Sequence, residues 1–448
     1  MYEPSRRAFV KTGAALLGGA TTGTTVTAGR ARNRFIVDSA RVRPKGDVEI
    51  VHRLDRVGLS VVRGTERDVR KLGAKYAADL TYSLDHPVEP ESVGGNVGAK
   101  DEPLYDLQWD KRDQRIPAVH EITRGEGTRV AIIDTGVAAG HPDLQHAVNV
   151  ELSRNFTDDS FGAAGPYGGY HGTHVAGIVA ANDRNETGVA GSAPGTELVD
   201  CRVFSTTAPQ ETLAAFFGDV LAAIVYSAEI GADAANLSLG AYLPRQGLGS
   251  FYGKLLNRTT TYANRRGTVL VHAAGNASTD LQHDKNYVDS SESAQGVGVS
   301  ATGPVGFEWG DSGLEEPFHS PAFYTNYGTN AIDLAAPGGD VDEELLELPA
   351  EERPDGWYRD LVLNCIAVPS FSESGEYLGV TYGYDWLAGT SMAAPQVTAA
   401  AALVKSVNPE YTPNQVASAL KRAAAVPDGY EKTYYGSGYL DPLSAVKG

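Results

Sequence analysis

Three short blocks of the chain carry the side chains that nucleophilic catalysis requires. Asp134 ends the apolar run TRVAIID, His171 opens the block HGTHVAG, and Ser391 lies in GTSMAAP. A serine hydroxyl is a poor nucleophile at neutral pH and needs a neighbouring base, and a buried carboxylate is best stabilised by a partner such as an imidazole N–H. Taken singly, the three residues could be a capping Asp, a packed core His and an N-cap Ser. Together, in the chain order Asp, His, Ser, they predict a catalytic triad.

The elements that must position these residues alternate between strand and helix from about residue 110. Continuous apolar runs predict strands that are buried on both faces, as in a mostly parallel sheet, and ligand sites in such sheets lie at the carboxyl ends of the strands. We expect strands at 128–134, 197–204, 234–239 and 268–274, and helices at 211–230 and 390–408.

These blocks resemble the subtilisin-like serine proteases, over roughly residues 101–447. The resemblance implies an α/β fold, a doubly wound and mostly parallel sheet with helices on both faces. It implies that Ser391 is the nucleophile, that His171 is the general base and acid, and that Asp134 orients the imidazole. The segment Ala273-Ala274-Gly275-Asn276 is similar to the family's oxyanion segment, so Asn276 would donate its amide together with the Ser391 backbone N–H. Gln396 and Ala399 depart from the family's usual His and Gly.

The resemblance also implies a substrate-binding edge. Ser238, Leu239 and Gly240 are similar to the strand along which this family aligns extended peptides, and Ala274 and Gly275 would line the same site. An open strand edge offers backbone N–H and C=O groups to a polypeptide. Polypeptides are therefore the expected substrates.

A calcium ion is the expected cofactor, and no organic cofactor is expected. The motif HPDL and the loop at 182–189 resemble the family's high-affinity calcium site, whose hard oxygen ligands suit this ion. The expected ligands are the side chains of Asp143 and Asn185 and the carbonyl groups of Asn182, Thr187 and Val189. The alternative is an ordinary polar surface loop.

The N-terminal hundred residues predict export and self-inhibition. The motif SRRAFVK followed by a mildly apolar stretch resembles a twin-arginine signal peptide at 1–29, with a basic tail as the alternative, and the stretch is too weakly apolar for a stable membrane span. Residues 34–37 and 58–62 predict strands and 65–72 a helix. By resemblance, residues 30–100 form an inhibitory, chaperone-like prodomain with a cleavable linker near 90–100, and residues 101–448 form the catalytic domain.

Charge divides the chain in the same way. The formal net charge is -18, but residues 1–100 hold 17 Lys and Arg against 11 Asp and Glu, whereas the rest holds 21 against 45. This acidity argues against nucleic acid as a partner. In its acidity and its twin-arginine motif, the chain resembles the secreted, halophilic, halolysin-like members of the family.

Two cysteines, Cys201 and Cys365, give no disulfide framework, although a single bridge between them stays open. The insertion at 340–385 could shape or cover the substrate cleft. We therefore predict a secreted, monomeric serine endopeptidase made as an autoprocessed zymogen. The alternative is a catalytically inactive, peptide-binding protein on the same fold.

Overall fold

The computed structural model describes residues 29–39, 42–43, 47–84, 104–206, 213–239, 243–244, 249–284, 287–288, 290–310, 313–372 and 374–448. The predicted signal peptide, apart from its last residue, and the predicted linker at 90–100 lie outside these residues. Within the described helices, none is long and apolar enough to cross a membrane.

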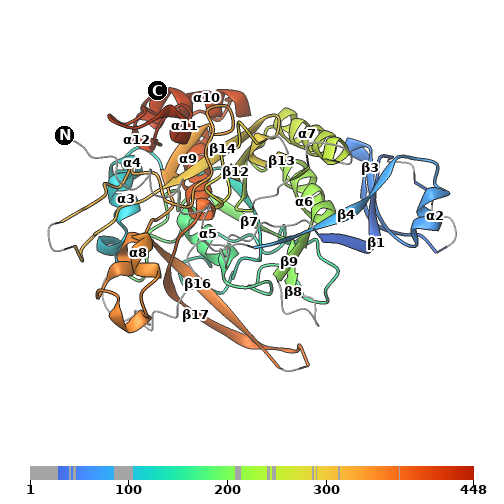
Figure 1. Cartoon of the computed structure of the whole chain (residues 1–448), viewed down its shortest axis with the longest axis horizontal. Coiled ribbons are helices and arrows are strands. Elements are labelled where there is room, and N and C mark those ends of the chain that lie inside the picture. Colours follow the sequence, from blue (N-terminus) through green and yellow to red (C-terminus); the bar gives the residue numbers. More distant parts are fainter. Residues whose placement is uncertain are drawn as a thin grey trace.

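A parallel sheet forms the centre of the molecule (Figure 1). Among the described residues it has seven strands, and every pairing in it is parallel. Its order is β15 (Leu334–Pro337), β14 (Gly296–Thr302), β12 (Val269–Ala273), β10 (Ala234–Leu237), β5 (Arg129–Asp134), β7 (Glu197–Arg202) and β6 (Arg154–Asn155). The expected strands at 128–134, 197–204, 234–239 and 268–274 are confirmed, with ends shifted by a few residues.

The two faces of this sheet belong to two hydrophobic cores. Val130 and Ile132 of β5 pack in one core with α5 (His171–Ala180) and α9 (Thr390–Val407). Ala131 and Ile133 point the other way, into a core with α6 (Phe217–Glu229) and α7 (Gly249–Arg266). This alternation along one strand is the reason why the run has no polar face. The prediction of helices on both faces is confirmed.

The N-terminal unit contributes β1 to β4, drawn in blue in Figure 1, to an antiparallel sheet that lies against α6 and α7. The described strands of this sheet run in the order β2 (Glu49–Leu54), β3 (Leu59–Arg63), β1 (Gly29–Val37), β4 (Tyr76–Ser83), β9 (Leu213–Phe216) and β8 (Phe204–Thr206). Ile36 of β1 faces the α6 and α7 core, whereas Phe35 and Val37 pack with Val69 of α2 (Glu66–Arg70). The predicted small α+β unit is present.

One expected helix begins later than its sequence predicts. The helix expected at 211–230 starts only at Phe217, and Leu213–Phe216 forms strand β9 instead. This strand pairs antiparallel with β4, from Thr81 opposite Phe216 to Ser83 opposite Ala214. The N-terminal sheet therefore continues onto the body of the protein.

The insertion before α9 contains a long hairpin of β16 (Val362–Phe371) and β17 (Tyr377–Leu387), which projects from the body in Figure 1. The remaining elements are η1 (Asp55–Val57), η2 (Leu104–Leu107), α3 (Trp109–Asp113), α4 (Ile116–His120), β11 (Leu243–Pro244), β13 (Tyr287–Val288), η3 (Ser290–Glu292), α8 (Glu343–Leu346), η4 (Ala350–Glu352), η5 (Trp357–Asp360), α10 (Pro413–Ala423), α11 (Lys432–Tyr435) and α12 (Pro442–Lys447).

Candidate active site

Asp134 and His171 meet where strand β5 ends and helix α5 begins. Asp134 is the last residue of β5, His171 is the first residue of α5, and His171 Nδ1 lies 2.8 Å from Asp134 Oδ1. A Cβ atom at Gly172 would lie 2.6 Å from the carbonyl oxygen of Gly136, so only glycine allows this close approach. The buried carboxylate thus favours the tautomer with its proton on Nδ1, which makes Nε2 the basic nitrogen.

Ser391 lies in the first turn of α9, directly after Thr390 and close to Gly389, whose φ of 150° suits a residue without a Cβ. Its Oγ donates to the backbone oxygen of Ser238 at 3.2 Å, and Ser238 Oγ donates to the Ser391 backbone oxygen at 2.6 Å. The structure therefore joins the predicted nucleophile to the predicted substrate segment. Both residues are buried.

Asn276 is fixed beside the nucleophile by a residue that the sequence had not singled out. The backbone N–H and the hydroxyl of Thr390 both donate to Asn276 Oδ1, at 2.9 and 2.8 Å. The Gly275 N–H donates to Thr390 Oγ1 at 3.0 Å. Because Oδ1 faces Thr390, the other half of the amide, Nδ2, is turned away from the helix and keeps its hydrogen atoms for a different acceptor.

The predicted substrate residues occupy the carboxyl ends of neighbouring strands. Ser238 and Leu239 follow β10, and Ala274 and Gly275 follow β12. Gly240 lies outside the described residues. The sequence did not predict strand β9, because its apolar residues also fit the helix that follows. In the structure, β9 pairs with β4 of the N-terminal unit on one side and with β8 on the other.

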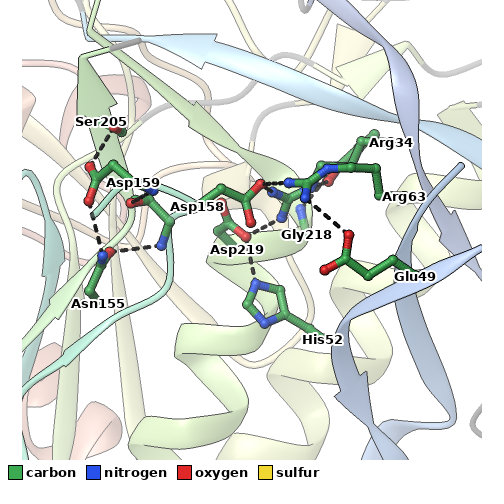
Figure 2. A network of polar contacts seen from close by, with 12 residues as sticks. Arg34, Glu49, His52, Arg63, Asn155, Asp158, Asp159, Ser205, Gly218 and Asp219 are labelled. Atoms are coloured by element: carbon green, nitrogen blue, oxygen red, sulfur yellow. Dashed lines mark hydrogen bonds and ion pairs between the residues drawn. The ribbon is translucent and has the colours of Figure 1, made fainter. Parts of the chain in front are cut away.

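A buried ionic network holds the N-terminal unit to the body (Figure 2). Arg34 Nε lies 2.9 Å from Asp79 Oδ2 and its Nη1 lies 2.9 Å from Asp158 Oδ2, while Nη2 contacts Asp219. His52 Nε2 is 2.6 Å from Asp219 Oδ1. Arg34, Asp79 and Asp219 are buried, so these contacts are only weakly screened by solvent.

Asp79 also caps the helix that it faces. Its Oδ1 accepts the N–H of Gly218 at 2.9 Å, in the first turn of α6. A carboxylate at a helix N-terminus satisfies an open backbone donor and favours the helix dipole. Burial raises the pKa of Asp79 to about 6, although Arg34 opposes this shift.

The expected calcium ligands gather around one buried carboxylate. Asn185 Nδ2 lies 2.5 Å from Asp143 Oδ1, the Val189 N–H donates to Oδ2 at 3.1 Å, and the Asn182 N–H donates to the Asp143 carbonyl at 2.9 Å. Thr187 lies in the same loop, with its N–H 3.3 Å from Asn185 Oδ1. The described partners of the Asp143 carboxylate are neutral, so no described cation compensates its buried negative charge, and this charge fits a hard cation.

The same carboxylate also contacts residues of the hairpin. Cys365 Sγ lies 3.9 Å from Asp143 Oδ2, and Tyr384 hydrogen-bonds to Asp143. Burial raises the pKa of the Tyr384 phenol, and the neighbouring Asp143 charge adds to this shift. His141 lies close enough to form a metal-binding group with Asp143 and Cys365. However, His141 Nδ1 accepts the Asp143 N–H and its Nε2 faces the Gly383 carbonyl, so both ring nitrogens are already engaged in structural contacts.

The two cysteines are buried and free, so the bridge that the sequence left open is not formed. Burial raises the pKa of both thiols well above its usual value, as expected for inert core thiols.

Comparison with known proteins gives the family of this chain. The sequence model of the subtilase family matches residues 125–438, which include all the predicted triad and oxyanion residues. The thermophilic serine proteinase of Bacillus sp. (strain AK1) is 29% identical over 327 residues, covering 73% of this chain and 63% of that protein. Halolysin of Haloferax mediterranei is 28% identical over 408 residues, covering 90% and 65%. The chain thus spans just under two thirds of the length of these two relatives.

A solved structure bears out the fold. The epidermin leader peptide processing serine protease of Staphylococcus aureus superposes with a TM-score of 0.67 at 20% identity, over 93% of this chain and 98% of that one. At this identity the likeness concerns the fold alone. The predicted subtilisin-like fold is confirmed.

Proposed function

This chain belongs to the subtilase family, and on that premise we propose that it is a secreted serine endopeptidase made as an autoprocessed zymogen. The contact that carries the proposal is the one between Asp134 and His171, at 2.8 Å, at the carboxyl end of β5. In this proposal His171 Nε2 takes the proton of Ser391 as its oxygen attacks a peptide carbonyl carbon. The same nitrogen then gives the proton to the leaving amine, and water hydrolyses the acyl-enzyme.

The oxyanion of the tetrahedral intermediate would lie between two donors. Asn276 contributes Nδ2, whose direction Thr390 fixes, and Ser391 contributes its backbone N–H. Both donors are positioned before substrate arrives, so little reorganisation is needed as negative charge develops.

Substrates would be polypeptides bound as extended strands. The pairing of β4 with β9 supports this, because an edge that accepts one antiparallel strand has the hydrogen-bonding groups to accept another. The same pairing supports a role of the N-terminal unit as an intramolecular inhibitor, since β4 occupies that edge.

Calcium belongs to the proposal as a structural ion. Asp143 and Asn185 would bind it with their side chains, and Asn182, Thr187 and Val189 with carbonyl groups. It would tie the loop at 182–189 to the body.

Export by the twin-arginine pathway is proposed on the N-terminal motif alone.

The decisive experiment compares the full chain with Ser391→Ala. We expect the parent to shorten itself by about the N-terminal hundred residues, to hydrolyse casein and to react with a fluorophosphonate. Ser391→Ala should stay at full length and do none of these. A folded parent that binds peptides but hydrolyses none, with and without calcium and molar salt, would instead support the alternative of an inactive peptide-binding protein.

A further inference from the structure

The base of the long hairpin lies next to α5, which begins with His171, and leads directly into α9, which carries Ser391. At its base, the Val362 and Asp385 carbonyl groups lie 3.1 and 3.2 Å from His174 Nε2, on the helix that His171 begins. At the same base, β17 ends at Leu387, which pairs with Val362 and lies four residues before Ser391. The hairpin therefore starts beside the candidate active site.

The far end of the hairpin lies against the loop that leads into His171. Phe371 and Tyr377 of the hairpin contact Phe161 and Tyr167 of that loop, with ring centroids 5.5 Å apart for Phe371 and Phe161 and 5.1 Å apart for Tyr377 and Tyr167. Phe161 and Tyr167 stack at 5.4 Å with an interplanar angle of 9°. All four residues, which we call the aromatic wall, are only half-buried.

A register shift in the hairpin produces this arrangement. Up to Ser370, which pairs with Gly379, the two strands are in regular antiparallel register, and the shift then places Phe371 opposite Tyr377. Without it Phe371 would face Leu378, which instead points outward and is 65% exposed. Bulges near active sites commonly re-aim one side chain in this way. The hairpin thus presents two aromatic rings to the loop and turns an aliphatic side chain to solvent.

The course of the chain indicates on which side of the scissile bond the hairpin lies. The segment before the predicted cleavage region ends with Ser83 paired to β9. After that region, the Leu104 N–H donates to the Gly188 carbonyl oxygen, and the Gln108 and Trp109 side chains donate to carbonyl groups at 363 and 361, at the base of the hairpin. From the N-terminal to the C-terminal side of that region, the described chain therefore passes from β9 to the base of the hairpin, the element whose far end carries Phe371 and Tyr377.

We infer that the aromatic wall is a substrate subsite, which binds an apolar or aromatic side chain of the polypeptide on the C-terminal side of the scissile bond. The inference rests on the proposed endopeptidase function and adds a preference to it. Half-buried aromatic rings bind such side chains through apolar contact and edge-to-face packing. This part of the substrate leaves with the amine product, so the wall would act before acylation.

The test uses enzyme produced from the full chain and internally quenched peptides that differ only after the scissile bond. One peptide carries Phe at the second and third positions after the bond, and the other carries Gly there. For the double variant Phe371→Ala, Tyr377→Ala, we expect the ratio of kcat/KM between the Phe and Gly peptides to fall about tenfold, mainly through KM. The matched control Leu378→Ala, at the same end of the hairpin, should keep the parent ratio.

The outcomes separate the inference from the function on which it rests. An active parent whose ratio is unchanged in the double variant, or changes equally in Leu378→Ala, would overturn the inference alone. A parent that cleaves neither peptide would overturn the proposed function and the inference with it. Melting temperatures of all variants, measured with the Ser391→Ala change added, exclude a loss caused by unfolding.

Discussion

Asn276 owes its direction to Thr390, and this makes the oxyanion proposal testable at two positions. The amide oxygen accepts two hydrogen bonds from Thr390, one from the backbone and one from the hydroxyl. Asn276→Ala removes the proposed donor and should lower kcat by about 10²–10³, the loss that such a change causes in subtilisin, with little change in KM. The measurement is steady-state hydrolysis of a peptide anilide.

Thr390→Val is a milder change that tests the same proposal. It removes the hydroxyl contact but leaves the backbone N–H, so Asn276 stays partly oriented and kcat should fall by about tenfold or less. A loss in Thr390→Val as large as in Asn276→Ala, at an unchanged melting temperature, would contradict the proposed role of Asn276 as the donor.

The placement of residues with short-range signals on strands and helices could be predicted from the sequence, and contacts that depend on distant partners could not. Asp134, His171 and Asn276 lie where local sequence places them, at a strand end, a helix start and a turn after a strand. Arg34 gave no such signal, because its partner Asp219 is 185 positions away and only the packed sheet brings them together.

Strand β9 shows why hydrophobic periodicity alone does not predict every strand. Leu213–Phe216 is apolar and directly precedes a helix, so its periodicity alone favoured an earlier helix start. Pairing with β4, which lies far earlier in the chain, decides the strand state. Strand preference is set by neighbours more than by intrinsic propensity.

The loop at 182–189 should depend on calcium if its proposed ligands are right. With Ser391→Ala protein, which cannot digest itself, we expect EDTA to lower the melting temperature by several degrees and calcium to restore it. Asp143→Asn should remove this difference, whereas Glu186→Gln, an exposed acid of the same loop, should keep it. An equal response of Asp143→Asn to EDTA would place the ion elsewhere.

The contact between the N-terminal sheet and α6 should carry a pH dependence from Asp79. Its pKa is raised to about 6 in the folded chain, so folding favours the protonated form. The resulting stabilisation is complete below the ordinary pKa near 4 and is lost as the pH rises through about 6. In Ser391→Ala protein, the free energy of unfolding should therefore increase relative to Asp79→Asn as the pH falls from 6 to 4, by up to about 1.4 kcal/mol per pH unit.

Two features make that comparison specific. Asp55→Asn alters an exposed acid of the same unit and should show no such drift against the parent. His52 and Arg34 face Asp219 in the same network and remain in both proteins, so their contribution is common to both. A drift in the opposite direction would mean that ion pairing with Arg34 outweighs the burial of Asp79.

Across the whole molecule, the charge is divided between a basic N-terminal hundred residues and a body with 21 Lys and Arg against 45 Asp and Glu. Several contacts that join them follow this polarity, including Arg34 and Arg63 with Asp158. Arg258 with Asp38 has the opposite polarity, so attraction between the two parts is not uniform. The excess negative charge of the body repels itself and favours expansion at low ionic strength.

Molar salt should therefore stabilise the protein. At 1 M salt the Debye length falls to about 3 Å, so repulsion between surface carboxylates is largely screened, whereas the buried Arg34 contacts are affected much less. We expect the melting temperature of Ser391→Ala protein to rise steadily from dilute buffer to molar KCl, by more than is found for a subtilase of near-neutral charge measured alongside. NaCl should act like KCl, because the argument requires only screening. A melting temperature that is already maximal in dilute buffer would contradict the halophilic interpretation of the acidity and leave the family and the active-site proposal unaffected.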